Sequence, residues 1–138
     1  MIVLFDTDVV LDLILDRKPF SEAAVQLFSK VEADEISGFV SATTITTIHY
    51  LAKKTIGAKK AKSAIHTLLS ILDVASVDRT VLERALEGKY KDFEDGVLVE
   101  AARQVEAKAI ITRNIRNFKK SIVPAYSPAE MLKMLRAV

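Results

Sequence analysis

The sequence predicts an α/β protein, a three-layer α/β/α sandwich on a mostly parallel sheet of about five strands. Short apolar runs alternate along the chain with segments whose apolar residues recur at helical spacing, a pattern typical of βαβ units. The first run, Met1 to Phe5, is too short for a helix and apolar throughout, as expected for a strand buried on both faces. No repeat or linker interrupts the 138 residues, so one domain, 1–138, is expected.

Local signals predict each element in turn. After the first strand a short helix covers 9–15, because Lys18-Pro19 breaks the pattern. Ser127, Pro128 and Glu130 supply a cap, a first-turn proline and a capping-box acid, which together start the last helix. The remaining helices are expected at 21–33, from the capping residues at 41–44 to Gly57, at 60–72, 78–86 and 95–105, and the last runs through 135. Further strands are expected at 37–40, 73–77, 109–112 and 122–126.

Composition excludes several classes of protein. The chain has no cysteine, so disulfides, thiolate nucleophiles and cysteine-based zinc sites are excluded. No basic stretch precedes the first apolar run, which is also too short for a signal peptide or a membrane span, so a cytoplasmic protein with no membrane partner is expected. A net charge of +2 is too small to indicate nucleic-acid binding unless the charges are clustered. No glycine-rich phosphate loop and no nucleophile-elbow motif is present.

Aspartates stand where chemistry is expected in a parallel sheet. Asp6 and Asp8 directly follow the first strand, and ligands bind at the carboxyl ends of such strands. In the helix at 95–105, Asp95 lies on the apolar stripe at the amino-terminal end, Asp92 lies near it, and Glu94 is expected to point away. Each of these aspartates also suits a plain helix cap, and that alternative stays open for each one taken alone.

Convergence of the two groups would favour a metal. Two carboxylates about 4 Å apart repel by ~4 kcal/mol at an effective dielectric constant of 20, unless a proton or a cation offsets the charge. With oxygen ligands and neither His49 nor His66 near them in sequence, the expected cation is Mg²⁺ or Mn²⁺.

Basic residues follow a second buried strand. The segment 112–120 comes directly after the strand at 109–112 and contains Asn114 and four cations, Arg113, Arg116, Lys119 and Lys120, without any acid. Such a segment can contact phosphates, or it can be an ordinary solvated loop. Another basic stretch, with five lysines between 53 and 62, surrounds a turn between helices and is expected to be mostly solvated.

Four segments, in order, resemble the motifs of PIN domains over nearly the whole chain. They are 6–12 (Asp-Thr-Asp-Val-Val-Leu-Asp), 40–45 (Val-Ser-Ala-Thr-Thr-Ile), 92–96 (Asp-Phe-Glu-Asp-Gly) and 111–114 (Ile-Thr-Arg-Asn) with Phe118. The resemblance implies a parallel sheet that gathers acids around Mg²⁺ or Mn²⁺, and hydrolysis of RNA phosphodiester bonds. Many small members are VapC-like toxins, homodimeric and neutralised by an antitoxin, so these are the partners that the resemblance implies.

The site residues transfer from this resemblance with one departure. Asp6 matches the first acid, Asp95 the third, and Asn114 stands in the fourth motif. Thr47 stands where the family usually has glutamate, and Asn117 where many members have aspartate. A hydroxyl in place of a carboxylate removes a full charge from the metal site, so the resemblance implies a weakened nuclease unless Asp8, Asp12 or Asp92 substitutes.

The first hypothesis is therefore a metal-dependent endoribonuclease. In it the metal ligands are Asp6 and Asp95 with Asp8 or Asp92, and Asn114 binds a water or the phosphate. Thr7, Thr44 and Thr47 support these groups by hydrogen bonds, and Arg113, Arg116, Lys119 and Lys120 contact the RNA backbone.

Two other hypotheses remain. The missing glutamate favours a PIN-like module that binds RNA or protein without cutting. A receiver-like domain, which also gathers acids around Mg²⁺, ranks last because such a domain needs a lysine directly after its last strand, where this chain has Ser127-Pro128.

Overall fold

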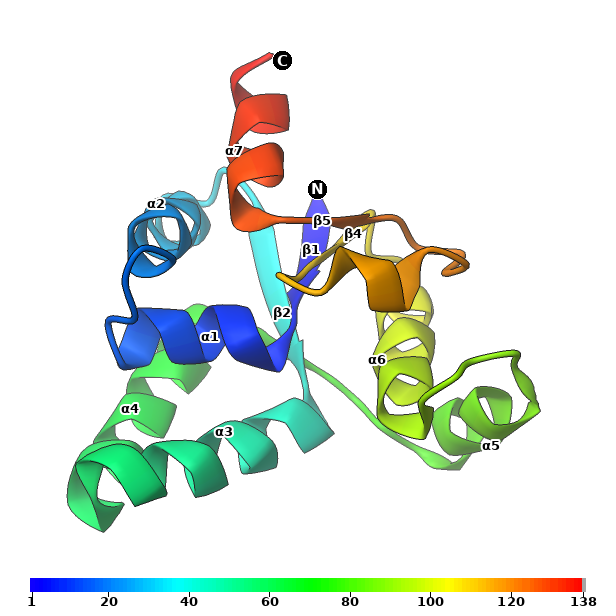
Figure 1. Ribbon diagram of the computed structural model, residues 1–138, viewed down its shortest axis with the longest axis horizontal. Coiled ribbons are helices and arrows are strands. Elements are labelled where there is room, and N and C mark those ends of the chain that lie inside the picture. Colours follow the sequence, from blue (N-terminus) through cyan, green and yellow to red (C-terminus); the bar gives the residue numbers. More distant parts are fainter. Residues whose placement is uncertain (138) are drawn as a thin grey trace.

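The computed structural model describes residues 1–137 as helices packed on both faces of a five-stranded sheet (Figure 1). Every strand pairing is parallel, and the strand order is β3-β2-β1-β4-β5. The strands are β1 Ile2–Phe5, β2 Ser37–Ser41, β3 Asp73–Ala75, β4 Ala109–Ile111 and β5 Ala125–Tyr126. The helices are α1 Thr7–Ile14, α2 Ser21–Glu32, α3 Ala42–Ile56, α4 Ala58–Ile71, α5 Arg79–Glu87, α6 Phe93–Gln104 and α7 Pro128–Arg136, with a 3₁₀ turn, η1, at Ile115–Phe118.

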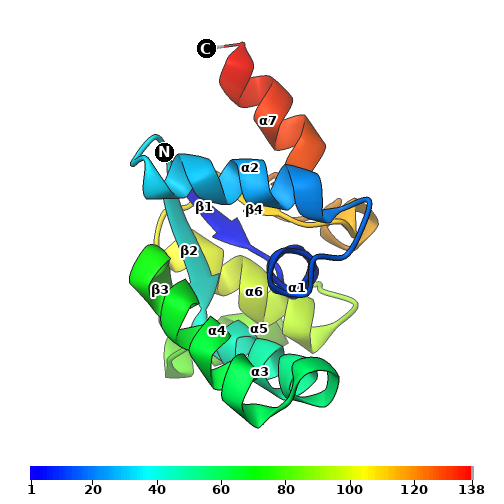
Figure 2. The same cartoon turned by 90° about the vertical axis from the view of Figure 1, so that its left-hand side faces the viewer.

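Two hydrophobic cores lie on opposite faces of the sheet. On the central strand β1, Val3 and Phe5 enter the core under α1, α2, α3, α4 and α7, while Leu4 enters the core under α5 and α6. This alternation is what a strand buried on both faces requires. Figures 1 and 2 show the two helical layers with the sheet between them. The predicted α/β/α sandwich is confirmed, with all five strands parallel.

The parallel sheet brings three distant segments to one edge. β1 lies between β2 and β4, and the register pairs Phe5 with Ile111. The backbone N–H of Asp6 continues the ladder to the carbonyl of Ile111 at 2.9 Å. Asp6, the start of α3 after Ser41, and Thr112 therefore meet where their strands end.

Several boundaries differ from the sequence prediction, and two of them affect this edge. α6 begins at Phe93, two residues early, because Asp92 caps it by accepting from the Glu94 N–H at 2.9 Å. The turn η1 was not predicted, and its Phe118 is buried in the second core. Elsewhere, α4 begins at Ala58, β3 ends at Ala75, and β5 is confined to Ala125–Tyr126. Within residues 1–137 no helix is both long and apolar enough to cross a membrane.

Candidate active site

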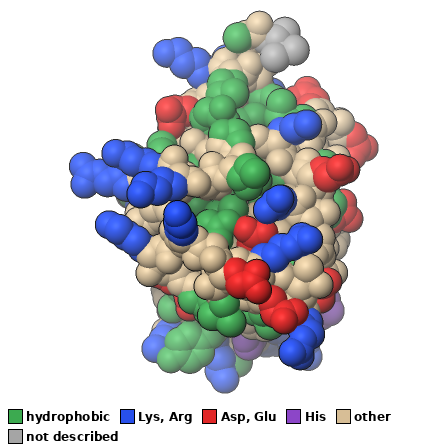
Figure 3. Space-filling model, turned by 90° about the vertical axis from the view of Figure 1, so that its right-hand side faces the viewer, with side chains coloured by type: hydrophobic (Ala, Val, Ile, Leu, Met, Phe, Trp, Pro, Cys, Tyr) green, Lys and Arg blue, Asp and Glu red, His purple; other side chains and the backbone are tan. Residues whose placement is uncertain are grey.

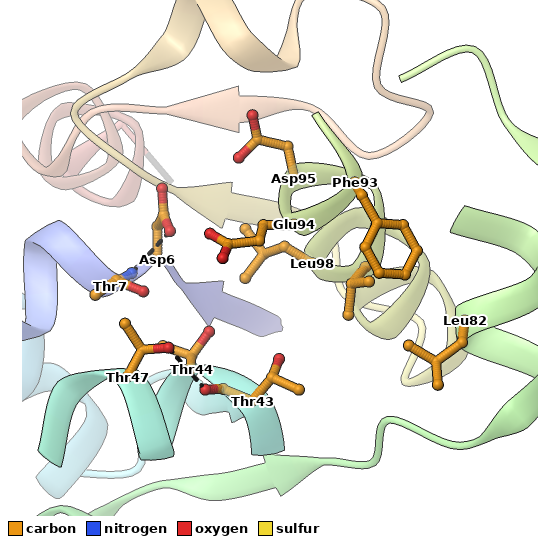
Figure 4. Close-up of a pocket in the computed structure, with 11 residues that line it drawn as sticks. Asp6, Thr7, Thr43, Thr44, Thr47, Leu82, Phe93, Glu94, Asp95 and Leu98 are labelled. Carbon is orange, nitrogen blue, oxygen red and sulfur yellow. Dashed lines mark hydrogen bonds between the residues drawn. The ribbon is translucent and has the colours of Figure 1, made fainter. Parts of the chain in front are cut away.

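A cavity of about 300 Å³ opens at the carboxyl edge of the sheet, between α1, α3, α5 and α6 (Figure 4). Its lining combines carboxylates, hydroxyls and apolar groups, and none of the lining side chains carries a positive charge. The lining residues are Asp6, Thr7, Thr43, Thr44, Thr47, Leu82, Phe93, Glu94, Asp95, Val97 and Leu98.

Asp6 is fixed at the edge of this cavity by two donors. Its carboxylate accepts from the backbone N–H of Thr7 at 2.7 Å and from the Thr112 hydroxyl at 2.8 Å. Burial nevertheless raises the pKa of Asp6, and the charges of Asp95 and Glu94 raise it further against the two hydrogen bonds. The structure therefore brings Asp6 and Asp95, 89 positions apart in the sequence, to one cavity.

The first turn of α6 supplies two acids to the cavity. Burial raises the pKa of Asp95, and the neighbouring charges of Asp92 and Glu94 add to the effect, with no hydrogen bond to lower it. Glu94 also lines the cavity, and Figure 4 shows its carboxylate on the side that faces Asp6. The sequence expectation that Glu94 points away was wrong, because side chains from all around the first turn face the strand ends where a helix meets a sheet end-on.

Asp8 turns from the cavity toward the loop after β4. Its Oδ2 accepts from the Arg113 N–H at 3.3 Å and from the Asn114 side-chain amide at 3.2 Å, while its Oδ1 is buried without a hydrogen-bond partner. Burial, followed by the charge of Asp6, raises the pKa of Asp8 to about 6. Asn114 thus contacts an acid that does not line the cavity, and Asp92 is exposed outside the lining as the cap of α6.

Asp12 and Arg113 form an internal ion pair that the sequence reasoning did not foresee. Asp12 is only 1% exposed, and it receives Arg113 Nε at 2.8 Å, Arg113 Nη2 at 3.2 Å and Arg17 Nε at 2.8 Å. The Arg113 guanidinium also stacks 3.9 Å over the ring of Phe20. Of the four cations predicted to contact RNA, Arg113 is therefore held inside the protein. No local signal links residues 101 positions apart.

The other three cations of this segment are exposed. Arg116 lies in η1, and Lys119 and Lys120 follow it directly. Figure 3 views the side of the molecule that carries η1, α5 and α6, and Lys and Arg side chains project from this face around acidic ones.

Threonines of α3 form the wall opposite α6. Thr44 is buried, and its hydroxyl shares a 2.8 Å hydrogen bond with Ser41, whose Oγ also accepts from the Thr44 N–H to cap α3. The Thr47 hydroxyl donates to the carbonyl of Thr43 at 3.2 Å and lines the cavity. Thr7 lines the cavity too, and its backbone N–H holds Asp6. The position where a glutamate was expected therefore presents a neutral hydroxyl.

The donor set fits a hydrated divalent cation. Within residues 1–137 no three acidic or histidine side chains are close enough to hold one ion together. Mg²⁺ commonly takes only one or two protein carboxylates and keeps several waters, so a site of this kind needs fewer ligands. The acids of the cavity are oxygen donors, and the raised pKa values of Asp6 and Asp95 show that the protein itself leaves their negative charge uncompensated.

Comparison with known proteins gives consistent matches. A family model described as PIN domain matches residues 2–116. The chain is 27% identical over 117 residues to Ribonuclease VapC1 of Aquifex aeolicus (strain VF5), covering 81% of each protein. Among solved structures, VapBC2 from Rickettsia felis bound to a promoter DNA fragment gives a TM-score of 0.72 at 15% identity, over 92% of this chain and 98% of that one. A toxin-antitoxin complex from Klebsiella pneumoniae gives 0.69 at 25% identity, over 91% and 97%.

Proposed function

Because this chain belongs to the PIN domain family, we propose that it is a metal-dependent endoribonuclease in which Asp6 and Asp95 bind Mg²⁺ or Mn²⁺. The observation that carries the proposal is the cavity in which these two acids meet, each with a raised pKa and without a cationic partner in the lining. A site that gathers uncompensated carboxylates at a strand edge is suited to a cation and to a substrate that brings its own phosphates.

The residues of the chain have distinct roles in this proposal. Asp6 is oriented by Thr7 and Thr112, and each carboxylate oxygen keeps a lone pair for a ligand. Glu94 supplies from α6 the third negative charge that Thr47 does not supply from α3. When bound, the cation activates a water and offsets charge on the phosphate. This assignment favours Glu94 over Asp8, Asp12 and Asp92 as the substitute acid.

The loop after β4 orients the ligands and adjoins the RNA path. Thr112 holds Asp6, and Asn114 holds Asp8, so Asn114 acts here by placing α1 and its acids. We assign backbone contacts to the exposed Arg116, Lys119 and Lys120 and not to Arg113, whose guanidinium binds Asp12.

The biological role that we propose is that of the toxin in a toxin-antitoxin pair. The curated relative is named a VapC ribonuclease, and the solved structures that this chain resembles include VapBC and toxin-antitoxin complexes. An antitoxin protein and a second copy of the chain would be its protein partners, in the cytoplasm. Co-purification with the product of a neighbouring gene would test the first partner, and light scattering the second.

Cleavage of a labelled single-stranded RNA in Mn²⁺ tests the enzyme. The wild type should cut and a chelator should stop it, while Asp6→Asn with Asp95→Asn should lower the rate by at least about 100-fold. The matched control is Asp16→Asn with Asp34→Asn, which removes the same charge at two exposed positions of positive φ that asparagine tolerates. Cleavage that persists in the site variant would rule this mechanism out.

The second candidate, a binding module that does not cut, is favoured by the hydroxyl of Thr47 at the position of the expected glutamate. Calorimetric titration with Mn²⁺ separates the two. Metal binding together with cleavage supports the enzyme, whereas RNA binding that ignores metal, without cleavage, supports the module.

A further inference from the structure

The cavity has two unlike walls. Carboxylates and hydroxyls form one part of its lining, and the other part is apolar, formed by Phe93, Leu82, Val97 and Leu98 (Figure 4). Phe93 stands next to Glu94 and Asp95 in the chain, yet its side chain is 45% exposed, and that of Leu82 is 38% exposed. An aromatic ring at the rim of an acidic cavity is thus left largely in contact with water.

Packing does not account for this ring. Phe93 belongs to neither hydrophobic core, whereas the nearby Tyr90 packs against the second one. The first position of a helix accepts many residue types, so α6 itself does not require an aromatic there. A large apolar surface kept exposed beside a functional cavity is typical of a ligand contact.

The segment that leads to Phe93 is held in place. A Cβ added at Gly88 or Gly96 would come within 2.7 Å of the Tyr90 ring, so both glycines make room for it. The Tyr90 hydroxyl donates to Glu100, which is 5% exposed. The ring of Phe93 is therefore presented from a start of α6 that is fixed on both sides, which lowers the entropy cost of binding a partner to it.

We infer that Phe93, backed by Leu82, stacks on an unpaired nucleobase beside the phosphate that the acids address, so that the substrate is single-stranded or loop RNA. This inference rests on the proposed function and extends it to the substrate class. A nucleotide joins an anionic phosphate to an apolar base, and the two walls offer separate places for them. A base inside a duplex has both faces covered by its neighbours, so only an unstacked base can lie on a protein ring.

The test uses the fact that the chain contains no tryptophan. Phe93→Trp, combined with Asp95→Asn so that RNA stays intact, makes one fluorescent reporter at the proposed stacking position. We expect a single-stranded oligoribonucleotide to quench its emission, its duplex not to, and a single abasic nucleotide at one position to remove the quenching. Leu86→Trp in the same background is the matched control, since Leu86 is 71% exposed on α5 and does not line the cavity.

A second measurement follows activity. Phe93→Ala should lower kcat/KM for the single strand roughly tenfold, as loss of one base stack does, while Leu86→Ala leaves it unchanged. Unquenched emission while anisotropy reports bound RNA, or an unchanged rate in Phe93→Ala, would overturn the stacking role alone. If the wild type neither binds nor cuts RNA, the proposed function and this inference both fail. If Phe93→Ala instead releases a protein partner while RNA binding stays intact, the ring is a protein contact and the inference is wrong.

Discussion

The acids of α1 and those of α6 share one edge of the sheet but stand in opposite electrostatic situations. Asp12 on α1 has both oxygens occupied by the guanidinium groups of Arg17 and Arg113. Asp95 on α6 has its pKa raised by burial and by neighbouring acids, with no hydrogen bond to offset them. The difference teaches that an acid near a strand end is informative only once its donors are known, because a paired carboxylate stabilises the fold and an unpaired one is free for a ligand.

Asp6 lies between these extremes. Two donors orient it, but burial and the charges of Asp95 and Glu94 still raise its pKa. An acid that is both oriented and uncompensated combines what a metal ligand needs, a fixed direction and unspent charge. The contrast between paired and unpaired acids can be tested directly, with effects that range from the whole fold to a small change with pH.

The largest effect is expected from the paired acid. Asp12→Asn should lower the free energy of unfolding by about 3 kcal/mol, because it leaves two guanidinium groups without their buried partner. Asp95→Asn should leave the stability of the metal-free protein unchanged or raise it, since it removes a carboxylate whose charge is disfavoured. Urea unfolding of both variants measures the contrast. Equal losses in the two variants would erase the distinction between the two groups of acids.

Metal should act only on the unpaired group. Mn²⁺ at 100 times its dissociation constant should stabilise the wild type by about 2.7 kcal/mol, measured as a rise in Tm that a chelator reverses. Glu94→Gln should reduce this rise and Asp92→Asn should not, although both lie at the start of α6, because only Glu94 lines the cavity. A reduction by Asp92→Asn with none by Glu94→Gln would reverse the assignment.

The brace behind α6 sharpens the comparison further. Tyr90→Phe should cost about 2 kcal/mol of stability, because the buried Glu100 carboxylate loses its donor while the ring packing remains. Tyr50→Phe is the control, since Tyr50 is 57% exposed. Chemical denaturation of both variants gives the two values, and a loss equal to that of the control would show that the hydroxyl does not hold α6.

The smallest effect is expected from the pH dependence of Asp8. Its folded pKa, about 6, exceeds the unfolded value of 3.8, so the folded state binds this proton more tightly. The stabilisation is present below pH 3.8 and is lost as the pH rises through 6. In the metal-free protein the wild type should therefore lose about 1 kcal/mol relative to Asp8→Asn between pH 4 and 7, allowing for the screening of a partly exposed carboxylate. A stability difference that does not vary with pH would contradict this account.

Much of the fold is predictable because its signals are local. The alternation of short apolar runs with helical periods indicated the sandwich, and the capping box at Ser127 and Glu130 indicated α7 correctly. The turn η1 was missed because its anchor, Phe118, acts through packing against the second core. The start of α6 was misplaced because Asp92 caps it through a side-chain hydrogen bond that other residues in the segment could have made equally well by pattern alone.

The sequence by itself determined the order of the elements, the placement of acids at strand ends and the resemblance to PIN domains, since each depends on residues close together in the chain. Only the tertiary structure decided which acids are spent and which are free. Asp12 meets Arg113 across 101 positions, and Glu94 enters the cavity because of how α6 docks against the sheet. Charge compensation depends on distance in space, and distance in space between remote residues is fixed only when the whole sheet has assembled.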